Sequence, residues 1–303
     1  MSSSIPEPFL LRCAELELAI YRWGEPRAGR AALLLTHGTG FCGPVWRTIA
    51  EAFASELVVY AVDRRGHGAS SKPADAYHFA DFAEDTVGVI DGLQLQGAYA
   101  IGHSAGATDL LLAAAQRPTA FRCIFAMEPT MMHPTTPEQR PELQATREER
   151  LQGAGRRRAS FPSYEQLFED YRGRPAFRNW QPDSLRAYVR YGFEQQPDGP
   201  VSLRCAPALE RAMLAHIFAA MDGTYRGDAR GIPFGLLSQV RCPTRISTTE
   251  SSQPIYKHMA EEARRALPNA SAHHFEGVGH LVAQVQPDLA IDALRRFWAE
   301  LAS

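Results

Sequence analysis

The stretch YAIGHSAGATDLLLAAAQ, residues Tyr99–Gln116, places Ser104 where a strand-like apolar run changes to helical spacing. A serine at this point often caps the helix, its oxygen accepting a hydrogen bond from a backbone amide. The flanking Gly102 and Gly106 indicate a turn so tight that its neighbours must be small. Such a turn presents the hydroxyl at a helix N-terminus, where the dipole favours developing negative charge. The context therefore favours a nucleophile over a cap.

Strand and helix patterns alternate on both sides of this stretch. A hairpin is expected at Leu10–Trp23. Strands are expected at residues 31–38 and 57–63, both buried, and at 97–104, 121–129 and 242–250, and residues 271–280 are expected to form a strand and its following loop. Helices are expected at 43–53, 81–93, 106–118, 255–267 and 289–301. This rhythm predicts an α/β fold with a mostly parallel, doubly wound sheet. Ligands of such folds bind at the carboxyl ends of the strands.

The alternation stops between Met132 and Leu236. This segment is rich in arginine and aromatic residues, is interrupted by prolines, and is too long for a loop of a compact domain. We expect a core formed by residues 1–131 and 237–303, and a helical cap, residues 132–236, inserted after the sixth strand of that core. The triplet Arg156–Arg158 is expected on a solvated helix face, with a phosphate or partner site as the alternative.

Composition limits the class of protein. The chain has 303 residues and a net charge of -2, which indicates no nucleic-acid partner. Its five cysteines are widely spaced with no CxxC pair, so neither a disulfide framework nor a zinc site is expected. No signal peptide and no membrane span is predicted. We therefore expect a cytoplasmic protein, and the sequence does not specify its oligomeric state.

A serine hydroxyl needs a base to remove its proton. The candidate is His280 in FEGVGHLV, because it follows the last predicted strand and should reach the same sheet edge as Ser104. His103 stands beside the serine but is expected to face away along the turn. His280 is therefore the preferred base.

A nucleophilic serine also needs donors that stabilise an oxyanion. In LLLTHGTGF, Gly38 and Gly40 allow the backbone to turn its amides toward the nucleophile. The two predicted donors are the backbone N–H groups of Thr39 and Ala105. His37 is expected to be structural.

Four motifs together resemble the α/β-hydrolase family with a helical cap: HGTG at His37–Gly40, DRRGHGAS at Asp63–Ser70, GHSAG at Gly102–Gly106 and GVGH at Gly277–His280. They occur in family order and span nearly the whole chain. The resemblance implies a Ser–acid–His triad, a small-molecule pocket under the cap, and neither a cofactor nor a catalytic metal. The serine distinguishes the chain from capped dehalogenases and epoxide hydrolases, which use an aspartate there.

The triad acid departs from the pattern of that family. Its usual place after the seventh strand falls on Ser252, in PTRISTTESS, and serine cannot stabilise an imidazolium. Two substitutes are available, Glu250 on the same strand end and Glu128 in FAMEPT at the end of the sixth strand. Some family members place the acid after the sixth strand, and Glu128 is preferred because it could reach the distal nitrogen of His280. A weak Ser–His dyad is the remaining alternative.

These residues predict a cofactor-free serine hydrolase that cleaves a small or medium, largely apolar carboxylic ester, lactone or thioester through an acyl-enzyme on Ser104. One alternative is a C–C bond hydrolase of the same fold. Another is a small-molecule receptor on the hydrolase scaffold with little turnover. The identity of the substrate, its acyl and alcohol preference and the pathway are not specified by the sequence.

Overall fold

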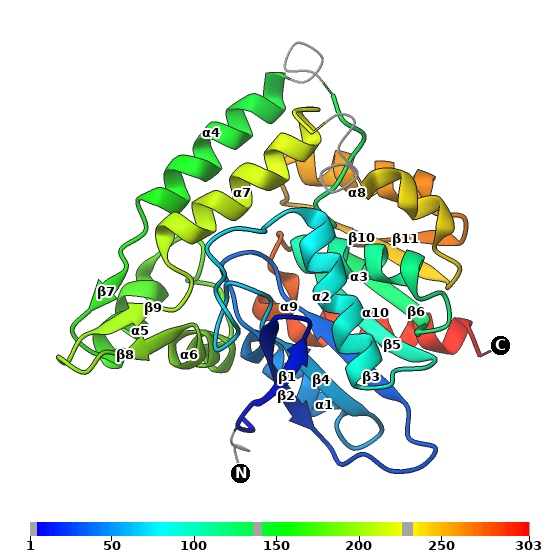
Figure 1. Cartoon of the computed structure of the whole chain (residues 1–303), viewed down its shortest axis with the longest axis horizontal. Helices are drawn as coiled ribbons and strands as arrows, with labels where there is room; N and C mark the ends of the chain where they lie inside the picture. The colour runs from blue at the N-terminus through cyan, green and yellow to red at the C-terminus, as the bar shows by residue number, and fades with distance from the viewer. Residues whose placement is uncertain (1–4, 136–140, 226–232, 303) are drawn as a thin grey trace.

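The computed structural model describes residues 5–135, 141–225 and 233–302. Within these ranges, eight strands form one sheet in the order β1-β2-β4-β3-β5-β6-β10-β11 (Figure 1). Their bounds are β1 Phe9–Cys13, β2 Leu16–Trp23, β3 Ala32–Thr36, β4 Val58–Val62, β5 Ala98–His103, β6 Phe121–Met127, β10 Thr244–Thr249 and β11 Ala270–Phe275. The hairpin β1–β2 and the pair β2–β4 are antiparallel, and every other neighbouring pair is parallel. The predicted mostly parallel α/β sheet is confirmed.

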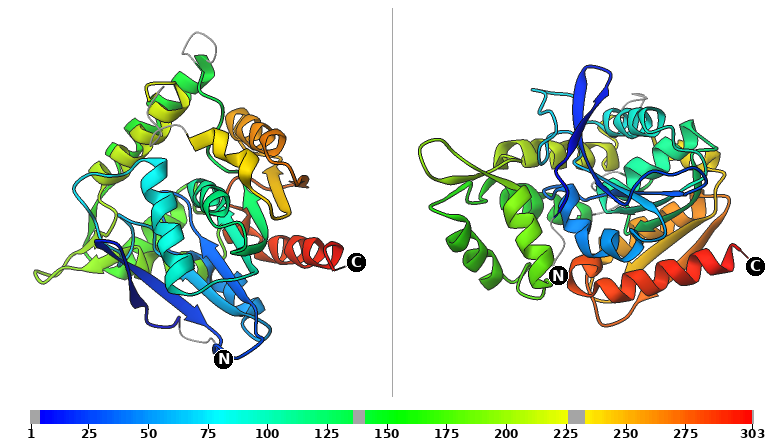
Figure 2. Two further views of the ribbon diagram at one scale, coloured as in Figure 1. Left: turned by 45° about the vertical axis from the view of Figure 1, so that its right-hand side comes forward. Right: turned by 90° about the horizontal axis from the view of Figure 1, so that it is seen from below.

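Helices cover both faces of this sheet. One face carries α2 (Phe79–Gly92), α3 (Ala105–Gln116) and α8 (Pro254–Ala266), and the other carries α1 (Arg47–Phe53) and α10 (Pro287–Glu300). In the right-hand view of Figure 2, the red α10 lies below the sheet and the cyan α2 above it. Successive strand side chains alternate between the two layers, so Leu34 joins one apolar cluster while Leu33 and Leu35 join the other. The continuous apolar runs of the strands follow from this double burial.

Residues 132–236, called the inserted segment below, separate β6 from β10. Its described elements are α4 (Pro141–Gly155), β7 (Ser160–Phe161), α5 (Tyr164–Gly173), α6 (Pro182–Tyr191), β8 (Phe193–Gln195), β9 (Val201–Leu203) and α7 (Pro207–Met221), and η2 (Pro233–Gln239) crosses its end. Helices α4 and α7 pack side by side (Figure 1). Strands β7, β9 and β8 form a small antiparallel sheet, so the expectation of helices alone was incomplete. Strands of two or three residues are too short to show alternation.

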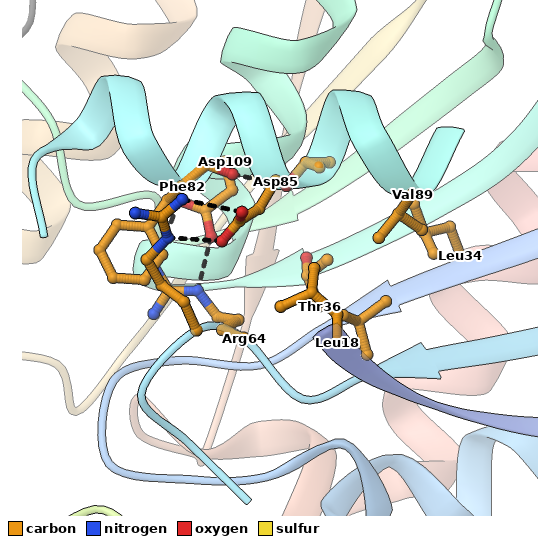
Figure 3. Close-up of a pocket in the computed structure, with 11 residues that line it drawn as sticks. Leu18, Leu34, Thr36, Arg64, Phe82, Asp85, Val89 and Asp109 are labelled. Carbon is orange, nitrogen blue, oxygen red and sulfur yellow. Dashed lines mark hydrogen bonds and ion pairs between the residues drawn. The ribbon is translucent and has the colours of Figure 1, made fainter. Parts of the chain in front are cut away.

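Two buried ion pairs anchor the loop that follows β4 (Figure 3). Arg64 lies 2.5 Å from Asp109 of α3, and Arg65 lies 2.6 Å from Asp85 of α2. The cavity beside them has a volume of only about 10 Å³, enough for one water molecule at most. The pairs therefore have a structural role, which is to fix this loop against the helical layer. No helix in the described ranges is long and apolar enough to cross a bilayer.

The loop after β3 is fixed by the loop after β4. The Gly40 amide donates to Nε2 of the buried His67 at 2.9 Å. The carboxylate of Asp63 accepts hydrogen bonds from the amides of Gly43 and Ala69 at 2.6 and 2.7 Å. Two glycine-rich loops from neighbouring strands are thus held together at the carboxyl edge of the sheet.

Candidate active site

Ser104 lies between β5 and α3 in a backbone conformation that L-residues rarely adopt, with φ 56° and ψ −124°. Its side chain makes no capping hydrogen bond to α3, so the capping interpretation does not hold. A Cβ on Gly102 would lie 2.5 Å from Ala107 Cα, and one on Gly106 would lie 2.5 Å from the His37 carbonyl oxygen. Both glycines are therefore required for α3 to approach the strands this closely.

His280 and Glu128 meet at the same sheet edge. Nδ1 of His280 lies 2.5 Å from Oε2 of Glu128, although 152 residues separate them in sequence. Glu128 directly follows β6, has a φ of 45°, and is 1% exposed. His280 lies beyond β11, and β10 lies between β6 and β11. The strand order therefore brings the two side chains together.

Two residues, one at the end of β10 and one in the following turn, hold the Glu128 carboxylate. Oε1 accepts hydrogen bonds from the Thr249 amide and hydroxyl at 2.9 and 3.0 Å, and Oε2 accepts one from the Ser252 hydroxyl at 2.7 Å. Burial raises the pKa of Glu128, but hydrogen bonds from His280, Ser252 and Thr249 outweigh burial and bring the pKa below its usual value. Ser252, at the position where the resemblance places an acid, instead donates to the acid from β6.

Glu250 lies apart from this pair. Its side chain is exposed, and its carboxylate accepts a hydrogen bond from the Gly277 amide at 2.7 Å. Within the described residues, no hydrogen bond joins Glu250 to His280. Of the two acids that the sequence left open, only Glu128 contacts the imidazole.

A cavity of about 700 Å³ contains the serine and the histidine. Thr39 and Ala105 also line it, and in the described part of the chain neither backbone N–H donates to a protein acceptor. The Ser104 hydroxyl and the His280 imidazole are not hydrogen-bonded to each other in these same ranges. Catalytic hydrogen bonds are often long without a substrate and shorten when it binds.

His280 lies between two aromatic rings. Tyr256 of α8 stacks on it at 4.2 Å between ring centroids, with planes 24° apart, and His103 packs against it at 4.4 Å. Nε2 of His103 donates to the His280 carbonyl at 2.8 Å. The expectation that His103 faces away was wrong, because a contact across 177 residues leaves no local signal. His37 is structural as expected: its Nε2 accepts from the Arg64 amide at 3.1 Å, and burial brings its pKa well below the usual value.

The inserted segment forms the wall of the cavity opposite the loops that carry Thr39, Ser104 and His280. This wall is made by α4, α7 and the connection after α5. Arg157 belongs to this wall, with its guanidinium paired to Glu210 of α7 and donating to the Tyr188 hydroxyl at 2.5 Å. The Tyr188 hydroxyl in turn donates to the Gly40 carbonyl at 2.9 Å. The expected solvated face was therefore wrong for Arg157. This residue lies just past the end of α4, where the chain turns and its side chain points inward instead of following the helix surface.

Comparison with known proteins agrees with this architecture. Residues 33–293 match the Alpha/beta hydrolase family. This chain belongs to the alpha/beta hydrolase family. Within that family, the 2-(acetamidomethylene)succinate hydrolase of Mesorhizobium japonicum is 26% identical over 88% of this chain and 87% of the relative.

Two solved alpha/beta hydrolases have similar folds. The crystal structure of E-2-(acetamidomethylene)succinate hydrolase has a TM-score of 0.78 and 22% identity, covering 96% of this chain and 98% of that one. The thioesterase domain from the curacin biosynthetic pathway has a TM-score of 0.74 and 19% identity, covering 97% of this chain and 100% of that one. At this identity the likenesses establish the fold. No group of three or more His, Cys, Asp or Glu side chains in the described ranges is arranged to hold a metal ion.

Proposed function

We propose that this chain is a serine hydrolase that cleaves a carboxylic ester, or a closely related lactone or thioester, through an acyl-enzyme on Ser104. The observation that carries the proposal is the buried Glu128–His280 hydrogen bond, formed at the cavity that also contains Ser104. A serine, an imidazole and a carboxylate that orients the imidazole are the components that activate a hydroxyl for attack on a carbonyl.

In this mechanism His280 takes the Ser104 proton as the hydroxyl oxygen attacks the carbonyl carbon, and returns it to the leaving group. Water then attacks the acyl-enzyme with His280 again acting as base, releasing the acid and restoring the serine. Glu128 holds the imidazole through Nδ1 and stabilises the imidazolium that forms in each half-reaction. The low pKa of Glu128 keeps it ionised at neutral pH, as this role requires.

The backbone amides of Thr39 and Ala105 are assigned to the oxyanion. Both residues line the cavity, and both amides are free of protein acceptors in the described ranges. Ala105 is the first residue of α3, so its amide belongs to the unpaired N-terminal group whose dipole favours an anion. One such donor contributes about 3–4 kcal/mol to transition-state stabilisation.

We further propose that residues 132–236 act as a cap and that residues 1–131 and 237–303 form the core. Helices α4 and α7 of the inserted segment close the cavity on the side opposite the loops that follow β3 and β5. The reaction requires no cofactor, because all its proton transfers are assigned to side chains of this chain. All five cysteines are buried and unpaired, which supports a reducing compartment such as the cytoplasm.

A C–C bond hydrolase remains the second candidate, since the same serine, base and oxyanion donors serve cleavage beside a ketone. The Mesorhizobium japonicum relative acts, by its name, on 2-(acetamidomethylene)succinate, which contains no ester. A substrate panel should therefore pair esters and thioesters with amides and β-diketones. A receptor with little turnover would bind such compounds without releasing acid.

The nucleophile can be tested without knowing the substrate. Wild type, Ser104→Ala and the exposed-serine control Ser160→Ala are treated with a fluorophosphonate, and the intact proteins are weighed. We expect one adduct on wild type and on Ser160→Ala, and none on Ser104→Ala. An adduct that persists in Ser104→Ala would place the reactive group elsewhere. No adduct on any protein would favour the receptor, and the panel would then be tested for binding.

A further inference from the structure

One arginine of the cavity has no carboxylate partner within the part of the chain that the structure describes. Three arginines line the cavity, Arg150, Arg157 and Arg174. Arg157 is paired with Glu210, and Arg174 with Asp170. Among the residues that the structure describes, Arg150 forms no ion pair.

The neighbouring carboxylate does not neutralise Arg150. Glu149 also lines the cavity, but its side chain is exposed to solvent, which screens its charge, and among the described residues no ion pair joins it to Arg150. Arg150 instead donates to the hydroxyl of Tyr256, and its guanidinium carbon lies 5.4 Å from the centre of that ring. A neutral phenol carries no charge that could pair with the guanidinium.

Arg150 lies near His280, because both side chains contact the ring of Tyr256. The Tyr256 ring that Arg150 contacts is the ring that stacks on His280, with centroids 4.2 Å apart. A single phenol ring therefore separates the guanidinium from the imidazole. The surrounding wall is apolar, with Leu143, Ile217, Met221 and Ile255 among its side chains. A charge in such surroundings interacts more strongly with an anion than it would in water.

We propose that Arg150 binds a free carboxylate of the substrate, so that the substrate class is acyl compounds carrying a second, unesterified carboxyl group. Half-esters of short dicarboxylic acids are the simplest members. The planar fork of guanidinium donors matches a carboxylate, and one donor to Tyr256 leaves others for the ligand. One uncompensated guanidinium matches the single charge of a carboxylate, whereas a phosphate dianion would bring an unbalanced second charge. This proposal rests on the proposed function of Ser104.

The test compares two esters that differ in one terminal group. Mono(4-nitrophenyl) glutarate carries a carboxylate where 4-nitrophenyl valerate carries a methyl group. We expect wild type to prefer the glutarate half-ester, and Arg150→Gln to lower kcat/KM for it by about 10- to 100-fold, chiefly through KM. The valerate ester should change by no more than about threefold, an energy below 1 kcal/mol. Arg156→Gln removes an exposed arginine just beyond α4 that does not line the cavity, and should leave both esters unchanged.

Equal rates on the two esters in wild type, or equal losses on both in Arg150→Gln, would overturn the proposal. Binding of glutarate to Ser104→Ala, measured by titration calorimetry, provides a readout without turnover. We expect binding that the double variant Ser104→Ala/Arg150→Gln loses, and equal or absent binding in both proteins would also overturn it. Fluorophosphonate carries no carboxylate, so its reaction with Ser104 does not depend on Arg150. If wild type is not labelled, the proposed nucleophile is refuted, and the binding of glutarate still tests Arg150 separately.

Discussion

Glu128 Oε2 lies 2.5 Å from His280 Nδ1, and the same oxygen accepts a hydrogen bond from Ser252 at 2.7 Å. The residue at the expected acid position thus supports an acid supplied by a different strand. Because β6 and β10 are neighbours in the sheet, exchanging the acid between their ends moves the carboxylate only a short distance. The geometry needed to orient an imidazole can therefore be kept although the motif is lost.

Replacing Glu128 tests this assignment directly. Glu128→Gln should lower kcat by about 10³- to 10⁴-fold, because the amide would stabilise the wrong imidazole tautomer and no imidazolium. Glu250→Gln, which removes the other candidate carboxylate, should stay within about threefold of wild type. Steady-state rates on the best ester of the panel measure both. A large loss in Glu250→Gln with an active Glu128→Gln would move the acid to Glu250.

The hydrogen bond from Ser252 should be visible in the pH dependence of stability. Because the folded pKa of Glu128 lies below that of an unfolded carboxyl, ionised Glu128 stabilises the fold at neutral pH. This stabilisation is lost as the pH falls through the folded pKa. Ser252→Ala should raise that pKa and lower the free energy of unfolding near neutral pH by about 1–3 kcal/mol. The difference from wild type should shrink in acid.

Urea unfolding from neutral pH to about pH 3, below the usual range of carboxyl pKa values, measures this difference. Ser251→Ala is the matched control, since Ser251 is exposed and its hydroxyl has no hydrogen bond to a described residue. If the free energy of unfolding lost in Ser252→Ala stays constant across the pH range, the hydroxyl does not act through the ionised carboxylate.

The pair Arg157–Glu210 should behave as a buried ion pair. Its side chains are 16% and 12% exposed, and burial lowers the pKa of Arg157 while Tyr188 and Glu210 raise it well above its usual value. Arg157→Met should lower the free energy of unfolding by about 3–5 kcal/mol, because it leaves the Glu210 carboxylate without a partner. Arg157→Met/Glu210→Met should recover most of the loss.

Denaturant titration of the single and double variants completes this cycle, with Arg156→Met as the exposed neighbour control. Additive losses in the double variant would indicate that the two charges do not interact. Activity should fall with stability, because Tyr188 connects this pair to the Gly40 carbonyl beside Thr39.

Two glycine substitutions should have opposite effects. Gly106→Ala places a methyl group 2.5 Å from the His37 carbonyl oxygen, and should destabilise the fold by about 1–3 kcal/mol. Gly153→Ala adds a methyl group in open space within α4, and should stabilise the protein by about 0.5–1 kcal/mol. Thermal unfolding distinguishes them. A neutral Gly106→Ala would mean that α3 can move away from β3 without cost.

Much of the scaffold could be predicted because its causes are local. Continuous apolar runs mark strands buried on both faces, and helical spacing marks the layers that cover them. The stretch around Ser104 carries its own evidence, since two small neighbours and a strand–helix junction specify a turn whichever partners surround it. The same applies to the order of the core elements along the chain. The short strands β7, β8 and β9 escaped prediction because two or three residues are too few to establish a pattern of alternation.

Only the tertiary structure decided which side chains meet. It placed Glu128 rather than Glu250 against His280, turned His103 onto the imidazole and brought Arg150 to Tyr256. These pairs are separated by more than 100 residues and depend on strand order, register and the packing of the inserted segment. Local sequence determines backbone conformation through sterics and hydrophobic periodicity. Contacts between distant side chains are determined only when the whole core packs.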